Sequence, residues 1–308
     1  MGKEKKALGR RVVHGISEGV NFSVLILLLL LLCFGIYALW DSALLYSGAS
    51  HNHYKEYKPT HDPRHYDDYV KENKDVIGWI ELYGTGCDYP IVQGNDNIYY
   101  LNHAADGHFE ASGSLYLDYR NQSNFQDYNN IIYGHHMDQH MMLGDLSLFL
   151  SQDYFKKHQY GKIYANHHWQ GLDIYALLET DANNTLIYHP GIKSLSQKQV
   201  YQSYIHDKAR LSRPMHISED DHLVLLSTCE GDITNGRIIL VCKMTKKIHK
   251  DPFGHKTSFH LFDHYGLLEE LKRCPLLVIA IINLLFLLCI LFLYNRYLSH
   301  KRKVESEK

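Results

Sequence analysis

The hydrophobic pattern of the chain shows two long apolar runs, one near each end, around a central region of shorter apolar segments. Residues 22–40 and 275–293 consist almost entirely of Leu, Ile, Val, Phe and Ala, and Asn283 is the polar residue of the second run. Each run is long enough to cross about 30 Å of hydrocarbon as a helix that rises about 1.5 Å per residue. Neither run carries the polar stripe of an amphipathic core helix, so the pattern predicts two membrane-spanning helices.

The central region contains many short segments with the period of β-strands, bounded by turn residues. The expected strands are residues 76–82, 89–93, 113–118, 130–133, 161–165, 172–178, 222–228 and 237–244. The expected helices are residues 66–73, 97–102, 142–158 and 196–209, the last with Ser194 or Ser196 as its cap. Together these elements predict a mostly β domain, a barrel or a sandwich, with helical insertions.

Basic residues flank both apolar runs on the side away from the central region. Lys3, Lys5, Lys6, Arg10 and Arg11 precede the first run, and Arg296, Lys301, Arg302 and Lys303 follow the second. Short basic flanks remain in the cytoplasm, so both termini are expected inside the cell and the central region outside. The small residues at 47–50 fit a signal-peptide cleavage site, but the first run is long for a signal peptide, and an uncleaved anchor is favoured.

These patterns divide the chain into seven parts. They are a basic cytoplasmic tail (1–21), a span (22–40), a stalk (41–65), an extracellular domain (66–247), a second stalk (248–274), a second span (275–293) and a second basic tail (294–308). The domain is long enough to bury a sizeable core. The formal net charge of −2 argues against a nucleic-acid binder.

Cysteine usage directs attention to one residue of the extracellular domain. Of the six cysteines, only Cys87, Cys229 and Cys242 lie in that domain, so they cannot all pair with one another. An odd thiol in an exported protein is a candidate reactive group. Cys229 ends one apolar run and Arg237 opens the next. Two neighbouring strands would therefore place a thiol and a guanidinium at the same end of a sheet.

A cysteine nucleophile needs a base, because at a pKa near 8.5 only about 3% of a thiol is ionised at pH 7. Histidine is the usual partner, and the chain has 22 histidines. His135 is the best candidate, since it follows the apolar strand 130–133 and Gly134, where a side chain projects from a sheet edge. Arg237 would supply a fork of donors for a carbonyl or a developing oxyanion.

Two other interpretations compete with this set. His135, His136, His140 and Asp138 could form a metal cluster, but the Glu of a zinc-protease motif is missing, and neither a metal nor another cofactor is expected. Cys87 could compete as the nucleophile, yet it has no neighbouring arginine strand and reads as a half-buried thiol. Cys242 lies within an apolar strand and is expected in the core.

These residues resemble a known family. Leu226-Ser227-Thr228-Cys229 is similar to the cysteine box of sortases, Tyr133-Gly134-His135 to their histidine box, and Arg237 to their arginine after a short loop. The segment 75–80 and the helix expected before the cysteine strand resemble class B sortases. Leu225 departs from the usual Thr, at a position on the strand before the nucleophile. The resemblance covers roughly residues 66–247.

The resemblance implies an eight-stranded β-barrel and a cysteine transpeptidase. Cys229 would attack the Thr–Gly bond of a sorting signal on a secreted protein, and His135 would act as general acid and base. Arg237 would stabilise the substrate or the oxyanion. The hydroxyl of Ser227 and the backbone N–H of Glu230 are weaker candidates for substrate binding.

The two spans resemble the topology of pilin-polymerising sortases. The favoured function is therefore pilus assembly in a Gram-positive cell membrane, in which the cut threonine of one pilin is joined to a lysine amine of the next. One alternative is attachment of a surface protein to a peptidoglycan amine. An alternative of another class is a non-catalytic, membrane-tethered scaffold that binds pilins.

Overall fold

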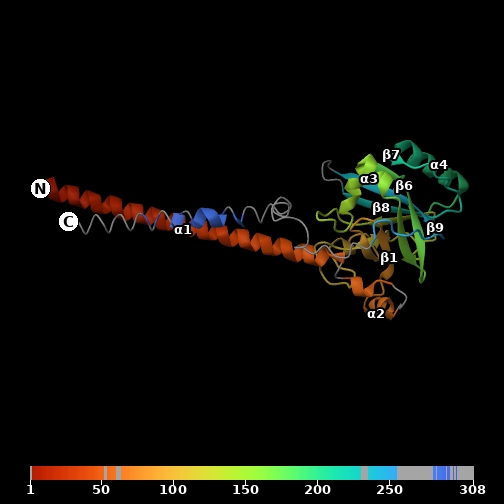
Figure 1. Ribbon diagram of the computed structural model, residues 1–308, viewed down its shortest axis with the longest axis horizontal. Coiled ribbons are helices and arrows are strands. Elements are labelled where there is room, and N and C mark those ends of the chain that lie inside the picture. The colour runs from red at the N-terminus through yellow and green to blue at the C-terminus, as the bar shows by residue number, and fades with distance from the viewer. Residues whose placement is uncertain are drawn as a thin grey trace. The chain divides into compact units, whose positions relative to one another are not determined.

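The structure is a computed structural model that describes residues 2–51, 54–59, 64–229 and 235–254, together with parts of 280–296. The chain forms two compact units, one of residues 1–44 with 261–308 and one of residues 45–260. The β domain belongs to the second unit (Figure 1).

Helix α1 (Gly2–Ala49) contains the first predicted span. Its stretch Gly15–Leu39 has 25 residues with a mean hydropathy of 2.8, so by length and composition it can cross a membrane. The second predicted span, 275–293, falls partly outside the described residues, and those described between 280 and 296 are helical. That span and the domain limits derived from it stay predictions.

The central domain is a closed β-barrel. Its strands are β1 (Val76–Leu82), β2 (Asp88–Val92), β3 (Leu115–Leu117), β4 (Asn129–Tyr133), β5 (Tyr160–Ala165), β6 (His168–Asp181), β7 (Ala209–Ser212), β8 (Leu223–Cys229) and β9 (Gly236–Thr245). Their order is β5-β1-β2-β3-β4-β8-β9-β6, and pairing of β5 with β6 closes the ring of eight, while β7 adds to β6. The expectation of an eight-stranded barrel is confirmed.

Short helices connect and cover the barrel strands. They are α2 (Arg64–Glu72), α3 (Gln152–Lys157) and α4 (Leu195–Lys208), with 3₁₀ turns η2 (Lys55–Tyr57), η3 (Tyr99–Leu101) and η4 (Gly144–Leu150). Helices α2 and α4 lie on opposite sides of the barrel (Figure 1). The single helix expected at 142–158 is divided at Ser151, whose side chain caps α3. Of the two caps expected for α4, Ser194 or Ser196, the structure has Ser194, which forms a capping box with Gln197.

Strands β8 and β9 divide their side chains between two apolar cores. Val224 and Leu226 point into the main barrel core, whereas Leu223 and Leu225 belong to a second core that includes Tyr201 of α4. Successive strand residues face opposite sides of a sheet, so a strand covered on both sides needs apolar residues at every position. The continuous apolar run before Cys229 therefore follows from the cover that α4 provides.

Close backbone approach at Gly171 brings the segment after β9 against β6 beside the pairing that closes the barrel. This residue of β6 pairs with Lys162 of β5 on one edge and with Thr245 of β9 on the other. A Cβ atom at Gly171 would lie 1.9 Å from the carbonyl oxygen of Lys247, which no side chain can accept.

We therefore expect Gly171→Ala to lower the free energy of unfolding of the full chain in detergent by roughly 1–3 kcal/mol, because the added methyl would overlap the Lys247 carbonyl and displace the segment after β9. Chemical denaturation provides the measurement. Ser212→Ala, at an exposed position of β7, is the control and should leave stability unchanged. A Gly171→Ala chain as stable as this control would show that the closure tolerates a side chain.

Candidate active site

The parallel pairing of β4 with β8 places His135 and Cys229 at the same edge of the barrel. The last register pair joins Tyr133 to Ser227. His135 lies two residues beyond Tyr133, and Cys229 two residues beyond Ser227. Because the two strands run in the same direction about 5 Å apart, both residues reach the same end of the sheet.

Arg237 lies on the other side of Cys229. Strand β9 runs antiparallel to β8, and its register pairs Arg237 directly with Cys229. The backbone thus brings the three predicted site positions together on three adjacent strand ends, with Cys229 in the middle. The Arg237 side chain is partly buried and donates a hydrogen bond from Nη1 to the carbonyl oxygen of Gly236 at 2.9 Å. The Cys229 side chain and residues 230–234, including the predicted Glu230, lie outside the described part of the structure.

His135 is held at both its backbone and its ring. The N–H of Gly134 donates to the carbonyl of Ser227 at 3.2 Å, and the N–H of Leu143 donates to the carbonyl of His135 at 3.1 Å. The ring nitrogen Nε2 lies 2.7 Å from the carbonyl oxygen of Leu101, the last residue of η3. A carbonyl only accepts, so Nε2 carries the hydrogen of this bond.

Ser227 lies on the same face of β8 as Cys229, because side chains alternate along a strand. Its side chain is buried, and its hydroxyl is hydrogen-bonded to the hydroxyl of Tyr188 at 2.8 Å. The Tyr188 ring stacks on Tyr133, with ring centroids 6.0 Å apart. Ser227 therefore connects the cysteine strand to the segment after β6.

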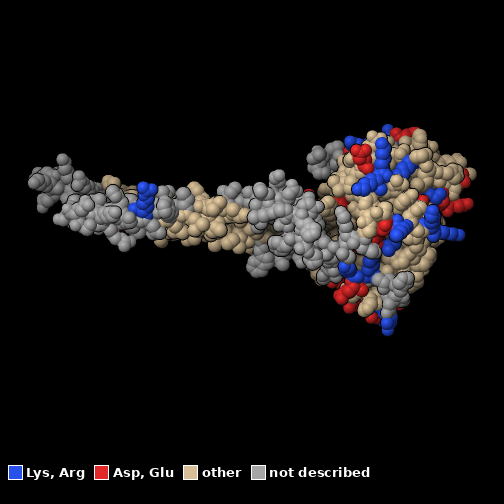
Figure 2. All heavy atoms as spheres, viewed as in Figure 1, with Lys and Arg blue, Asp and Glu red and all other residues tan. Residues whose placement is uncertain are grey.

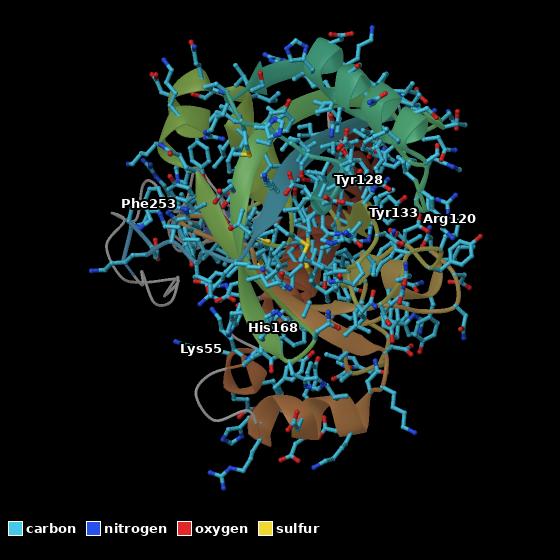
Figure 3. All side chains as sticks on the ribbon, turned by 90° about the vertical axis from the view of Figure 1, so that its right-hand side faces the viewer. Lys55, Arg120, Tyr128, Tyr133, His168 and Phe253 are labelled. Atoms are coloured by element: carbon cyan, nitrogen blue, oxygen red, sulfur yellow. The ribbon has the colours of Figure 1, made fainter. Side chains whose placement is uncertain are left out.

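The buried carboxylate of Asp118 joins the loops around this edge. It accepts hydrogen bonds from Arg120 at 2.7 and 2.9 Å, from Asn97 at 3.0 Å and from the Tyr133 hydroxyl at 3.0 Å. Arg120 also donates to the carbonyl of Tyr188 at 3.2 Å. Tyr133 and Arg120 lie on the same side of the barrel (Figure 3). Burial would raise the pKa of Asp118, but the hydrogen bonds from Arg120 and Asn97 outweigh it and hold that pKa below its ordinary value.

The other two domain thiols lie in different surroundings. Cys87 is 2% exposed just before β2, and burial raises the pKa of its thiol well above the ordinary value. Cys242 is fully buried in β9, where burial raises its pKa to about 12 although Arg213 opposes the shift. Neither thiol ionises readily at neutral pH, so neither fits a nucleophile better than Cys229.

The histidines proposed as an alternative metal cluster have separate partners. His140 Nδ1 lies 2.6 Å from the Asp145 carboxylate, whereas His135 contacts Leu101. Among the described residues, no group of three or more His, Cys, Asp and Glu side chains is arranged to hold a metal ion.

On the face of the β domain that Figure 2 shows, the surface charge is mixed. Lys and Arg side chains are interspersed with Asp and Glu over the face shown in Figure 2. This face therefore lacks the continuous positive field that nucleic-acid binding needs.

Three features of the site were not predicted from the sequence. They are the Leu101 carbonyl, the Tyr188 hydroxyl and the Asp118–Arg120 pair. A backbone carbonyl leaves no signal in the residue type that carries it. Asp118 had a weak signal, since it is a carboxylate at the end of the expected strand 113–118, two residues before an arginine.

Comparisons with known proteins give a consistent result, although no family model matches the chain. Sortase B of Listeria monocytogenes is 32% identical over 191 residues, which cover 58% of the chain and 74% of that relative. The structure of a sortase B from the type II pilus of Streptococcus pneumoniae is 42% identical, with a TM-score of 0.52 over 58% of this chain and 97% of that one. A Streptococcus pyogenes class B sortase involved in pilus biogenesis is 36% identical, with a TM-score of 0.53 and the same coverages of 58% and 97%.

Removing the Asp118 charge should destabilise the site edge. We expect Asp118→Asn to lower the free energy of unfolding at pH 7 by roughly 1–3 kcal/mol, because buried donors lose an ionised acceptor. The folded-state pKa is below the ordinary 3.8, so the carboxylate stabilises the fold above that pH, and its contribution disappears as pH falls through the lowered pKa.

The difference in free energy of unfolding between the native chain and Asp118→Asn, measured with denaturant from pH 7 to pH 3, should therefore become smaller only below about pH 4. Asp220→Asn, which changes an exposed carboxylate, is the matched control and should stay within experimental error of the native chain. A deficit that is absent at pH 7, or that grows at low pH, would contradict this role of Asp118.

Proposed function

The chain belongs to the sortase family and has a class B core, and on this premise we propose that it is the cysteine transpeptidase of a pilus-assembly reaction. Its substrates would be pilins or other surface proteins that carry a sorting signal. Its acceptor would be a lysine amine of the next pilin. Two spans would hold the enzyme in the cell membrane, with both termini in the cytoplasm and the barrel outside.

In the proposed reaction, Cys229 and His135 exchange protons with the substrates in two steps. The Cys229 sulfur attacks the threonine carbonyl carbon, the C–N bond to glycine breaks, and His135 delivers the thiol proton to the departing amine. The lysine amine then attacks the thioester, the new C–N bond forms, and the C–S bond breaks. His135 takes the amine proton and returns it to the cysteine sulfur, so the enzyme is regenerated.

Arg237 and Ser227 have supporting roles in this proposal. The Arg237 guanidinium would donate hydrogen bonds to the substrate carbonyl oxygen, where negative charge develops in both tetrahedral intermediates. Ser227 and the N–H of Glu230 would contribute to substrate binding.

The register of β4, β8 and β9 is the observation that supports this assignment best. It brings a histidine, a cysteine and an arginine that are far apart in sequence to adjacent strand ends. The pilus role is supported by the identities of 42% and 36% with two sortases from pilus systems. The apolar stretch of α1 supports membrane anchoring alone.

We expect Cys229→Ala, expressed in the bacterium in place of the native chain, to abolish the high-molecular-weight pilin ladders seen on denaturing gels. The alanine removes the sulfur that forms the thioester. Cys87→Ala is the matched control, because it removes a buried domain thiol, and ladders should remain.

Three outcomes separate the candidate functions. Ladders and wall-linked monomers that both persist in Cys229→Ala would contradict the enzyme and support a non-catalytic scaffold. Ladders that remain while wall-linked monomers disappear would favour attachment to peptidoglycan. Loss of ladders with the chain present at normal abundance supports pilin polymerisation.

Arg237→Lys should reduce turnover of a peptide with the pilin's own sorting signal by roughly 10²–10³-fold, because lysine keeps the charge but loses the fork of donors. Its thermal unfolding should match that of the native chain. Arg210→Lys on β7, an exposed arginine paired with Glu179, is the control. Near-native turnover by a folded Arg237→Lys enzyme would show that Arg237 contributes only a charge and that its fork of donors is not needed.

A further inference from the structure

The ring of His135 has one described hydrogen bond, which it donates to a backbone atom of another segment. Its Nε2 donates to the carbonyl oxygen of Leu101 at 2.7 Å. In a neutral imidazole one nitrogen carries a hydrogen and the other accepts one. The Leu101 carbonyl therefore selects the form protonated at Nε2 and leaves Nδ1 as the nitrogen that can gain a proton.

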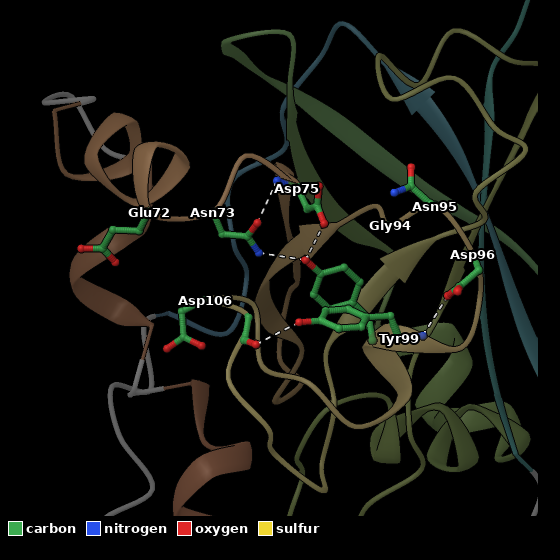
Figure 4. A pocket seen from close by; sticks show the side chains of 10 residues that line it. Glu72, Asn73, Asp75, Gly94, Asn95, Asp96, Tyr99 and Asp106 are labelled. Atoms are coloured by element: carbon green, nitrogen blue, oxygen red, sulfur yellow. Dashed lines mark hydrogen bonds between the residues drawn. The ribbon is translucent and has the colours of Figure 1, made fainter.

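The turn that ends at Leu101 is held by side-chain hydrogen bonds to the segment between α2 and β1 and to the loop after β2. The Tyr100 hydroxyl donates to the Asp75 carboxylate and accepts from the Asn73 amide, both at 2.8 Å. The Asp96 carboxylate accepts from the backbone N–H of Tyr99 at 2.9 Å. Figure 4 shows these bonds along the wall of a cavity of about 330 Å³ that Tyr99 and Tyr100 help to line. These bonds fix Tyr99 and Tyr100, and with them the position of the turn.

Gly113 and Ser114, at the far end of the same loop, lie close to the carbonyls of Tyr100 and Leu101. The N–H of Ser114 donates to the carbonyl of Tyr100 at 3.0 Å. Gly113 has a φ of +59°, and a Cβ there would lie 2.5 Å from the Leu101 oxygen and 2.6 Å from the Tyr100 oxygen. Only glycine permits both this backbone conformation and this close approach.

From these contacts we infer that residues 99–114 form a positioning loop for His135, in which Gly113 and Tyr100 are the positioning residues and the Leu101 carbonyl is the group they place. This inference rests on the proposed role of His135 as general acid and base. It adds that the proton passes through Nδ1 in every step, while Nε2 keeps its hydrogen and its bond to Leu101. The Leu101 side chain is 40% exposed and is not required for this bond.

The glycines of the loop provide a matched pair of variants. Gly107 also has a positive φ, of +93°, but nothing lies within 4 Å of a Cβ added there. Gly107→Ala therefore introduces a similar backbone strain without displacing Leu101. Gly113→Ala introduces the strain and also pushes against the carbonyl that holds His135.

The kinetic test compares the two variants in full-length enzyme, with a peptide carrying the pilin's own sorting signal. We expect Gly113→Ala to lower kcat roughly 10- to 100-fold with KM nearly unchanged and a shifted pH profile, because the imidazole is misplaced. Gly107→Ala should keep the native pH profile and a kcat within about threefold, since Leu101 is undisturbed. A folded Gly113→Ala enzyme with native kcat and pH profile would overturn the inference.

Two further measurements keep the inference testable if Gly113→Ala does not fold. Tyr100→Phe removes both hydrogen bonds of the hydroxyl but keeps the ring, and it should show the same kcat loss and pH shift to a smaller extent. The ¹⁵N NMR spectrum of histidine-labelled full-length protein in detergent reports the tautomer, with the His135 signal identified by its absence in His135→Gln. A signal protonated at Nδ1, or an unchanged pH profile in Tyr100→Phe, would refute the positioning role.

The NMR result is independent of turnover, so failure of the inference can be separated from failure of the proposed function. A native enzyme without Cys229-dependent cleavage of the peptide would refute the function. The tautomer would still show whether Leu101 holds the ring.

Discussion

The parallel pairing of β4 with β8 is the constraint on which the site depends. Parallel neighbours need a long crossover, and here residues 134–222 form it and supply α3, β5, β6, α4 and β7 on the way. Because both strands run in the same direction, the residues that follow them gather at one edge. A slip of one residue would turn Cys229 to the opposite face of the sheet. The pairing therefore decides at which edge of the barrel position 229 lies.

Hydrogen bonds at the start of the two strands hold this register. The buried Asn130 amide donates to the carbonyls of Asp127 and Leu223, each at 3.0 Å, and the N–H of Leu223 donates to the carbonyl of Tyr128 at 2.8 Å. The alternation of β8 between two cores opposes a slip as well, because a shift would exchange the partners of every apolar side chain. Hydrogen bonds at the start of β4 and β8 and the packing of β8 thus define the register. The ends of these strands are therefore free to carry polar site residues.

Local patterns explain which parts could be predicted from the sequence. Strands such as 76–82 and the Cys229 strand are long enough for period and composition to identify them, and the three site positions follow because each lies next to a strand end. Strand β7 was missed because it has four residues and pairs only with β6. The prediction of one continuous helix at 142–158 was wrong, because the Ser151 side chain caps the start of α3 and so separates it from η4. Contacts between distant loops, such as Arg120 with Tyr188, leave no periodic trace in the sequence.

Because a backbone carbonyl orients His135, the residue that carries this carbonyl is not the one most sensitive to substitution. A side-chain acceptor would make its own position sensitive to substitution, whereas Leu101 can exchange its side chain without losing the bond to Nε2. The constraint moves instead to Gly113, whose missing Cβ makes room for the carbonyl, and to Tyr100, whose hydroxyl fixes the turn. A histidine at a strand end is thus placed by the barrel and oriented by a loop. The orientation of the ring therefore depends on the hydrogen bonds that tie this loop to Asn73, Asp75 and Ser114, in addition to the pairing of the barrel strands.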